Sequence, residues 1–284
     1  MLIILLFAVL SILFITLYIL IIPTKLILIP LLALLGIVSA ILVITLYIFF
    51  IYIICPYSNP KSKFKQALLY PIVDFARIMC NVKYKVIGKE NIPSNTFVGF
   101  PNHKSYFDIV LLYLALNKPL GAAGKKELFK NKIFKRLGNA IGCITIDRDN
   151  DRESIKNIIK ATKIIESGLN YIIFPEGGRK SLDTDLMVDL KPGAYKLATK
   201  PKADILPISL IGNSSMTKKK ILERKKVTVI IHNPIKYEEY KDYNTQELGL
   251  LVGTIVNEGI KNGTPNKKPL KDIEIVPFIQ ENEE

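Results

Sequence analysis

The chain has 284 residues, which is long enough for one large core domain and an anchor. Its 39 Lys and Arg against 25 Asp and Glu give it a formal net charge of +14. Its three cysteines and two histidines have no metal-ligand spacing, which argues against a metal site. The lysines are scattered and match no recognised nucleic-acid motif, so the charge favours an anionic membrane surface over nucleic acid as partner.

Residues 1–56 are predicted to form a membrane anchor, because Lys25 is the one charged residue among them. Two apolar runs, Leu2–Ile22 and Leu26–Cys55, are each long enough for a bilayer core that needs about 20 residues. The sequence Pro23-Thr24-Lys25 separates them, so we expect a helical hairpin. The hairpin either spans the bilayer or enters one leaflet.

Residues 57–81 are predicted to form an interfacial amphipathic segment. Three lysines follow the second apolar run closely, at Lys61, Lys63 and Lys65. By the positive-inside rule they place this side of the hairpin, and the domain that follows, in the cytoplasm. The apolar positions from Phe64 to Met79 predict a surface helix interrupted at Pro71. A helix that packs on the following domain is the alternative.

Between residues 82 and 263, short apolar runs alternate with helical stretches. The expected strands are Tyr84–Ile87, Thr96–Phe100, Ile144–Ile146, Tyr171–Phe174, Ile205–Ile211 and Val227–Ile231. The expected helices are Tyr106–Leu116, Lys126–Leu137, Asp151–Ser167, Pro192–Lys200 and Asn244–Lys261. This alternation predicts an α/β domain with a mixed or parallel central sheet flanked by helices. The C-terminal tail, residues 264–284, is expected to be loosely held.

The stretch NHKSYFD, residues 102–108, lies between an expected strand and an expected helix. His103 is a candidate general base, because a free imidazole titrates near neutrality. Asp108 can hold the ring in one tautomer if His103 lies in the turn before the helix, since five residues along one helix would separate the two. Ser105 and Asp108 also match the S-x-x-D capping pattern, so Asp108 as a mere helix cap is a second interpretation, compatible with the first.

A second polar turn, PEGGRKS at residues 175–181, follows the expected strand Tyr171–Phe174. Its glycines let backbone N–H groups approach an anion, and Arg179 offers a planar fork for phosphate. A charged surface turn is the alternative. Two more blocks, GCITIDR at residues 142–148 and DILPI at residues 204–208, contain short strands. His232 closes a later strand, and we interpret it as structural.

In their order and spacing, NHKSYFD, GCITIDR, FPEGGRK and DILPI resemble the four blocks of the glycerolipid acyltransferases, most closely the 1-acylglycerol-3-phosphate (lysophosphatidate) acyltransferase branch. The resemblance covers about Val82 to Pro234, and KKELF at residues 125–129 resembles the Lys-x-Glu-Leu of that family. It implies His103 as catalytic base and Asp108 as its partner. The other implied site residues are Glu176 and Gly177 for the acceptor, and Lys125, Arg179 and Arg148 for its phosphate. Gly178 departs from the usual Thr of the family.

The resemblance implies that residues 82–263 form the acyltransferase catalytic domain of an integral membrane protein facing the cytoplasm. This enzyme would move a fatty acyl group from a thioester, acyl-CoA or acyl carrier protein, to the sn-2 hydroxyl of lysophosphatidate, giving phosphatidate. The thioester is a co-substrate, and no cofactor is expected. Because no G-x-S-x-G occurs, direct transfer in a ternary complex is simpler than a serine acyl-enzyme. Another acceptor, such as glycerol-3-phosphate or a different lysophospholipid, is the near alternative. A non-enzymatic protein that binds anionic lipid is the far alternative.

Overall fold

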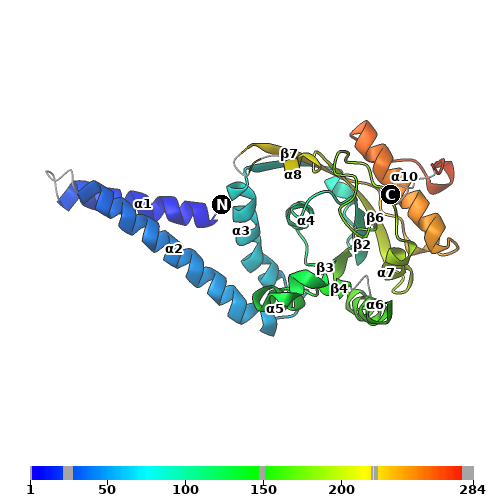
Figure 1. Ribbon diagram of the computed structural model, residues 1–284, viewed down its shortest axis with the longest axis horizontal. Coiled ribbons are helices and arrows are strands. Elements are labelled where there is room, and N and C mark those ends of the chain that lie inside the picture. The colour runs from blue at the N-terminus through cyan, green and yellow to red at the C-terminus, as the bar shows by residue number, and fades with distance from the viewer. Residues whose placement is uncertain (1, 22–27, 147–150, 219, 221–222, 277–284) are drawn as a thin grey trace.

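The computed structural model describes residues 2–21, 28–146, 151–218, 220 and 223–276. Two long apolar helices, α1 (Leu2–Ile21) and α2 (Leu28–Ile54), lie side by side and project from the rest of the molecule (Figure 1). Within the described residues, Ile29–Tyr57 is long and apolar enough to cross a membrane, with a mean hydropathy of 2.8. The expected helices of the hairpin are present, whereas Lys25 lies outside the described residues.

The segment after the hairpin forms a short 3-10 turn, η1 (Cys55–Tyr57), and then helix α3 (Lys63–Met79). The expected interruption at Pro71 is wrong, because Pro71 lies inside a continuous helix. A helical proline leaves the carbonyl four residues earlier without its partner, and here that residue is the exposed Ala67, whose carbonyl water can reach. Helix α3 packs against α4 and β1, which favours the packed-helix interpretation.

Seven strands form one sheet within the described residues, in the order β1-β7-β6-β2-β5-β3-β4. They are β1 (Val82–Ile87), β2 (Phe97–Pro101), β3 (Leu120–Lys125), β4 (Ile144–Ile146), β5 (Asn170–Ile172), β6 (Asp204–Ile211) and β7 (Lys225–Ile231). Strands β2 to β6 are mutually parallel, β7 runs antiparallel to β6, and β1 is parallel to β7. The expected α/β fold with a mixed sheet is confirmed.

The longer helices of the domain are α4 (Asp108–Leu116), α5 (Lys132–Ala140), α6 (Asp151–Glu166) and α10 (Thr245–Asn262). The shorter ones are η2 (Lys89–Asn91), η3 (Lys126–Lys130), η4 (Pro192–Tyr195), α7 (Lys196–Thr199), α8 (Ser215–Lys218), α9 (Tyr237–Tyr240) and η5 (Leu270–Asp272). In Figure 1, α4 and α10 lie on opposite sides of the strands. Both faces of the sheet are therefore covered, as a largely parallel sheet requires.

Strand β2 shows how the core is divided between these two faces. Phe97 packs in a cluster with Leu112 of α4, whereas Val98 packs in a cluster with Leu251 of α10. Successive side chains of a strand point to opposite faces, so a strand buried on both sides must be apolar throughout. All five residues of β2 are buried, which explains its continuous apolar sequence.

Strand β3 was not expected from its sequence, LGAAGK, because Gly and Ala are poor strand formers. It forms between β5 and β4, where its small residues allow close packing. A Cβ atom at Gly121 would lie 2.6 Å from the ring of Tyr171, so a larger residue would not fit. Tertiary packing therefore decides this strand.

The first part of the C-terminal tail is packed, and the expectation that it is loosely held is wrong for residues 264–276. Its Ile273 is buried, and the N–H of Val276 donates to Oγ1 of Thr254 (3.2 Å). The N–H of Asn266 donates to Nδ1 of His232 (2.9 Å). Residues 277–284 lie outside the described residues.

His232 is buried and neutral, in agreement with its structural interpretation. Its Nδ1 accepts from Asn266, so Nε2 carries the proton and faces Oγ of Ser209 at 2.8 Å. That hydroxyl donates in turn to the carbonyl of Val256 (2.7 Å). A Cβ atom at Gly259 of α10 would lie 2.3 Å from the imidazole, so this glycine allows the helix to approach. Burial lowers the pKa of His232 to about 4.

We expect His232 to make the fold sensitive to mild acid. An unfolded histidine titrates near 6.5, so between pH 6.5 and 4 the unfolded chain binds more protons and stability falls as the pH falls. At pH 5 the loss is about 2 kcal/mol relative to pH 7.5. The measurement is the free energy of unfolding at both pH values for wild type and His232→Asn, whose amide does not titrate and can still accept from Asn266. Equal acid losses in the two proteins would contradict this role.

Candidate active site

The polar turns predicted from the sequence meet at one edge of the sheet. Parallel strands β2, β3, β4 and β5 all end at this edge, and the turns that contain His103 and Glu176 follow β2 and β5. Lys125 is the last residue of β3, so it lies at the same edge of the sheet. Arg148 follows β4 and lies outside the described residues. Clustering of loops at the carboxyl ends of parallel strands is typical of a ligand site.

His103 lies in the turn before α4, where its ring meets the side chain of Asp108. Nδ1 of His103 is 3.0 Å from Oδ2 of Asp108. Because the carboxylate accepts, Nδ1 carries the proton and the lone pair is on Nε2, which has no hydrogen bond to any described residue. The ring of Phe174 stacks on the imidazole, with the centroids 3.9 Å apart. His103 is partly exposed and Asp108 is fully buried.

The capping interpretation of Asp108 needs a correction in its geometry. Helix α4 begins at Asp108 itself, and its N-cap, Phe107, makes no side-chain cap bond. Oδ2 of Asp108 instead accepts from the backbone N–H groups of Lys104 and Ser105, both at 2.9 Å. The carboxylate therefore shapes the turn that contains His103 as well as binding its ring. Ser105 as the N-cap of α4 is therefore wrong, whereas the bond from its N–H to Asp108 that the capping pattern predicts is present.

Asn102 attaches the start of this turn to the sheet. It is fully buried, and its Nδ2 donates to the carbonyls of Asp185 (2.7 Å) and Leu210 (2.9 Å). Its Oδ1 accepts from the N–H of Leu210 at 2.7 Å. Because Leu210 belongs to β6, the backbone before His103 is fixed relative to a strand that neighbours β2.

Glu176 forms a buried ion pair with Lys104. Nζ of Lys104 lies 2.8 Å from Oε2 of Glu176 and also donates to the carbonyl of Lys180 (2.8 Å), and both charged side chains are fully buried. Oε1 of Glu176 accepts from the N–H of His103 at 2.7 Å. Burial raises the pKa of Glu176 to about 7, against the opposing effect of Lys104 and the N–H donors. Glu176 therefore binds two residues of the His103 turn, through the His103 N–H and the Lys104 ammonium group.

Gly177 adopts a left-handed conformation, with φ at +67°, in the turn after β5. Its N–H donates to the carbonyl of Phe174 at 3.1 Å and closes that turn. This bond occupies the Gly177 N–H, so any anion that approaches this loop must bind other N–H groups. Lys180 in the same loop pairs with Asp189.

Arg179 rests on the ring of Tyr106, with Cζ 3.5 Å from the ring centroid. Tyr106 is exposed and belongs to the turn that contains His103. A guanidinium stacked on an aromatic face is held in orientation while its N–H groups stay available at its edge. The structure therefore brings Arg179 to the His103 turn.

Sequence reasoning named His103, Asp108, Glu176 and Arg179, and the structure brings these four together. It missed Lys104 and Tyr106, and gave Asn102 no role. Each of the three lies in the NHKSYFD block, but each binds a partner more than 70 residues away in the chain. A buried lysine has no local sequence signal, so these contacts were not predictable from the block alone.

Known proteins resemble this chain in sequence and in fold. The acyltransferase family model matches residues 83–211. A probable 1-acyl-sn-glycerol-3-phosphate acyltransferase of Mycoplasma pneumoniae is 29% identical over 203 residues, which are 66% of this chain and 74% of that protein. A protein of the same description from Mycoplasma genitalium is 31% identical over 164 residues, 56% of this chain and 59% of that protein.

The crystal structure of the 1-acyl-sn-glycerophosphate (LPA) acyltransferase PlsC from Thermotoga maritima has a TM-score of 0.60 and 21% identity, covering 78% of this chain and 95% of that one. At this identity the likeness supports the fold.

Residues 83–211 match the acyltransferase family model, so the resemblance of the four blocks to the glycerolipid acyltransferases is confirmed. Within that class, the relatives described above are named as 1-acyl-sn-glycerol-3-phosphate acyltransferases, the branch that the blocks resemble most closely.

Proposed function

We propose that this chain transfers a fatty acyl group from an acyl thioester to the sn-2 hydroxyl of lysophosphatidate and produces phosphatidate. One observation carries the proposal: Asp108 binds Nδ1 of His103, so that Nε2 can accept a proton at the open edge of the sheet. The alternative, a non-enzymatic lipid-binding protein, requires neither residue. Similarity to the relatives named above supports lysophosphatidate as the acceptor.

In this mechanism Nε2 of His103 takes the proton of the acceptor hydroxyl as the oxygen attacks the thioester carbonyl carbon. Asp108 stabilises the imidazolium that forms. The carbon–sulfur bond then breaks, the ester remains on the acceptor, and the imidazolium returns its proton to the leaving thiolate. The chain supplies no nucleophile of its own in this scheme. Orientation of the two substrates at the sheet edge contributes much of the rate.

The phosphate of lysophosphatidate is proposed to bind Arg179, whose guanidinium stacks on Tyr106 of the His103 turn and, among the described residues, is not paired with a buried carboxylate as Lys104 is. Lys125 at the end of β3 and Arg148 after β4 are proposed as further phosphate ligands, because both follow strands that end at the same edge. Glu176 and Gly177 then act by shaping the loop that presents Arg179. The donor is acyl-CoA or acyl carrier protein, and no cofactor or metal enters the scheme.

The membrane is the proposed location of this reaction. Helices α1 and α2 are apolar on all sides, and most of their described side chains are exposed. Such helices are stable where lipid surrounds them. We propose that residues 1–56 anchor the protein, with residues 82–263 as the catalytic domain at the cytoplasmic face. The lysines at 61, 63 and 65 support this orientation by the positive-inside rule.

We expect Arg179→Ala to raise the KM for lysophosphatidate, because it removes a charge-assisted contact of about 1.5–3 kcal/mol, or about 10- to 100-fold in kcat/KM. Arg179→Lys should recover only part of the loss, since a point charge cannot bind two phosphate oxygens in parallel. Lys125→Ala should act in the same direction. The measurement is kcat/KM on lysophosphatidate and on lysolipids without a terminal phosphate.

Variants of Tyr106 provide the matched control for this series. Tyr106→Phe keeps the ring beneath Arg179 and should behave as wild type, whereas Tyr106→Leu should raise KM several-fold with little change in kcat. If the Arg179 variants lose equal activity on phosphate-bearing and neutral acceptors, Arg179 does not bind the phosphate. The alternative of another acceptor would then gain support.

A further inference from the structure

An apolar and basic surface lies on η3 and α5, which follow Lys125 at the end of β3. Three large apolar side chains are exposed there, on Leu128 (41%), Ile133 (57%) and Phe134 (45%). Exposed cations surround them, at Lys126, Lys130, Lys132, Lys135 and Arg136. We call the apolar and basic residues together the α5 surface. Glu127 is the acidic residue within it.

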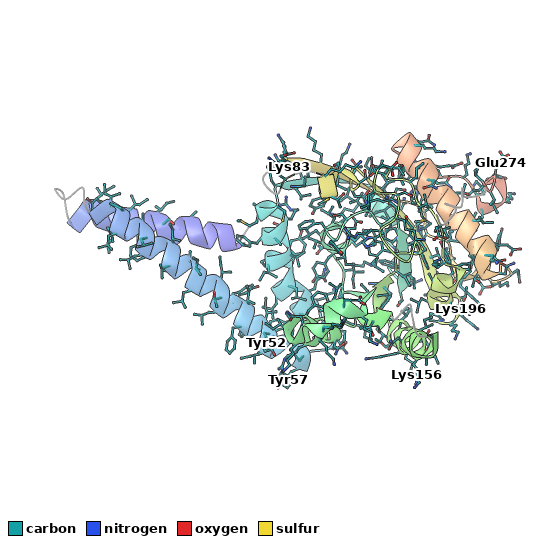
Figure 2. The ribbon with its side chains drawn as sticks, in the orientation of Figure 1. Tyr52, Tyr57, Lys83, Lys156, Lys196 and Glu274 are labelled. Atoms are coloured by element: carbon teal, nitrogen blue, oxygen red, sulfur yellow. The ribbon has the colours of Figure 1, made fainter. Side chains whose placement is uncertain are left out.

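The α5 surface continues directly from the end of the anchor helix. Arg136 stacks on the ring of Tyr52 of α2 at 4.7 Å, and its Nε donates to the Tyr52 carbonyl (3.3 Å). Figure 2 shows Tyr52 and Tyr57 at this end of the helix, and Figure 1 shows α5 beside it. Tyr57 is 82% exposed. Two tyrosines where an apolar helix ends are typical of the membrane–water interface.

A largely apolar hollow of about 630 Å³ lies between the anchor and the α5 surface. Its lining includes Cys55, Leu69, Leu128, Phe134 and Leu137. Exposed apolar side chains around an apolar hollow are unfavourable in water and favourable against acyl chains. The ring of cations outside them matches anionic headgroups.

Lys65 holds the α5 surface in a set position relative to the anchor. Its Nζ donates to the carbonyls of Ser58 (2.7 Å) and of Ala140, the last residue of α5 (2.5 Å). Lys65 is 1% exposed, so its ammonium group does not reach lipid headgroups. The exposed cations of the α5 surface lie beside this contact and can face lipid headgroups.

We infer that the α5 surface docks on the anionic bilayer beside the anchor, with Leu128, Ile133 and Phe134 among the acyl chains and the cations among the headgroups. The inference rests on the proposed anchoring by α1 and α2. A second copy of this chain is a poorer occupant, because it would bring a like-charged surface against these cations. Docking here would orient the catalytic domain toward the lipid in which an acyl acceptor dissolves.

The chain contains no tryptophan, so one introduced tryptophan reports its own surroundings. Full-length Phe134→Trp and Ile133→Trp are each reconstituted in anionic vesicles that contain brominated acyl chains, and tryptophan quenching is measured. Ile275→Trp is the control, because Ile275 has a similar exposure (40%) and follows Glu274, which lies far from the anchor in Figure 2. Retained acyl transfer verifies that each variant is folded.

We expect the reporters on α5 to be quenched about three-fold more than the control, as for side chains 5–10 Å inside the interface. Changing Lys130, Lys132 and Lys135 to Glu should reduce this quenching toward the control level in anionic vesicles. Equal quenching in reporters and control, in protein that floats with the vesicles, would overturn the docking while leaving the anchor intact. Protein that does not float would overturn the anchor and the inference with it. If the tryptophans on α5 are instead shielded to an extent that depends on protein concentration and not on lipid, the α5 surface binds a second copy of the chain.

Discussion

His103→Ala is expected to reduce acyl transfer by about 10²–10⁴-fold, the range that a general base contributes. The ring packs against Phe174 and is partly exposed, so its removal should cost little stability. The loss should fall on kcat, because the imidazole acts on the hydroxyl that reacts and not on the phosphate that binds. The measurement is kcat and KM for both substrates, with unfolding followed in parallel. Substantial turnover by a well-folded His103→Ala variant would exclude the mechanism.

Asp108→Asn separates the two tasks of this carboxylate. The amide oxygen can still accept from the backbone N–H groups of Lys104 and Ser105, so the turn should keep its shape. The negative charge that stabilises the imidazolium is lost, so kcat should fall strongly with little change in unfolding. A fall in stability that matches the fall in activity would instead mean that Asp108 serves only the turn.

The buried pair of Lys104 and Glu176 is expected to produce the largest stability effect. Removal of one partner leaves the other charge buried and uncompensated, which typically costs about 3–5 kcal/mol. Lys104→Met and Glu176→Gln should therefore each destabilise the protein strongly. Activity should also fall through kcat, because Oε1 of Glu176 binds the N–H of His103 and sets the position of the base.

The double variant Lys104→Met/Glu176→Gln tests whether the charges act as a pair. It buries no net charge, and the glutamine can still accept from the N–H of His103, so part of the lost stability should return. Lys241→Met is the surface control, because Lys241 pairs with Glu238 at 3.0 Å in solvent and should have little effect. Additive losses in the double variant, measured by denaturant unfolding, would contradict the pairing.

Features that depend on residues close together in the chain were predictable from the sequence. The apolar runs predicted α1 and α2, and the alternation of strands and helices predicted the fold class. The contact between His103 and Asp108 was also predictable, because five residues separate them and a turn before a helix brings them together. Order and spacing of the four blocks were enough to predict the match to the acyltransferase family model.

Features that join distant segments of the chain depend on the three-dimensional fold and were not predictable from the sequence. Strand β3 forms from glycine and alanine because its neighbours pack closely on it, although local propensity opposes a strand. Lys104 pairs with Glu176, and Arg179 stacks on Tyr106, because β2 and β5 are adjacent and end at the same edge of the sheet. Neither pairing has a local signal, since the free energy of burying and pairing a charge depends on what the fold places beside it.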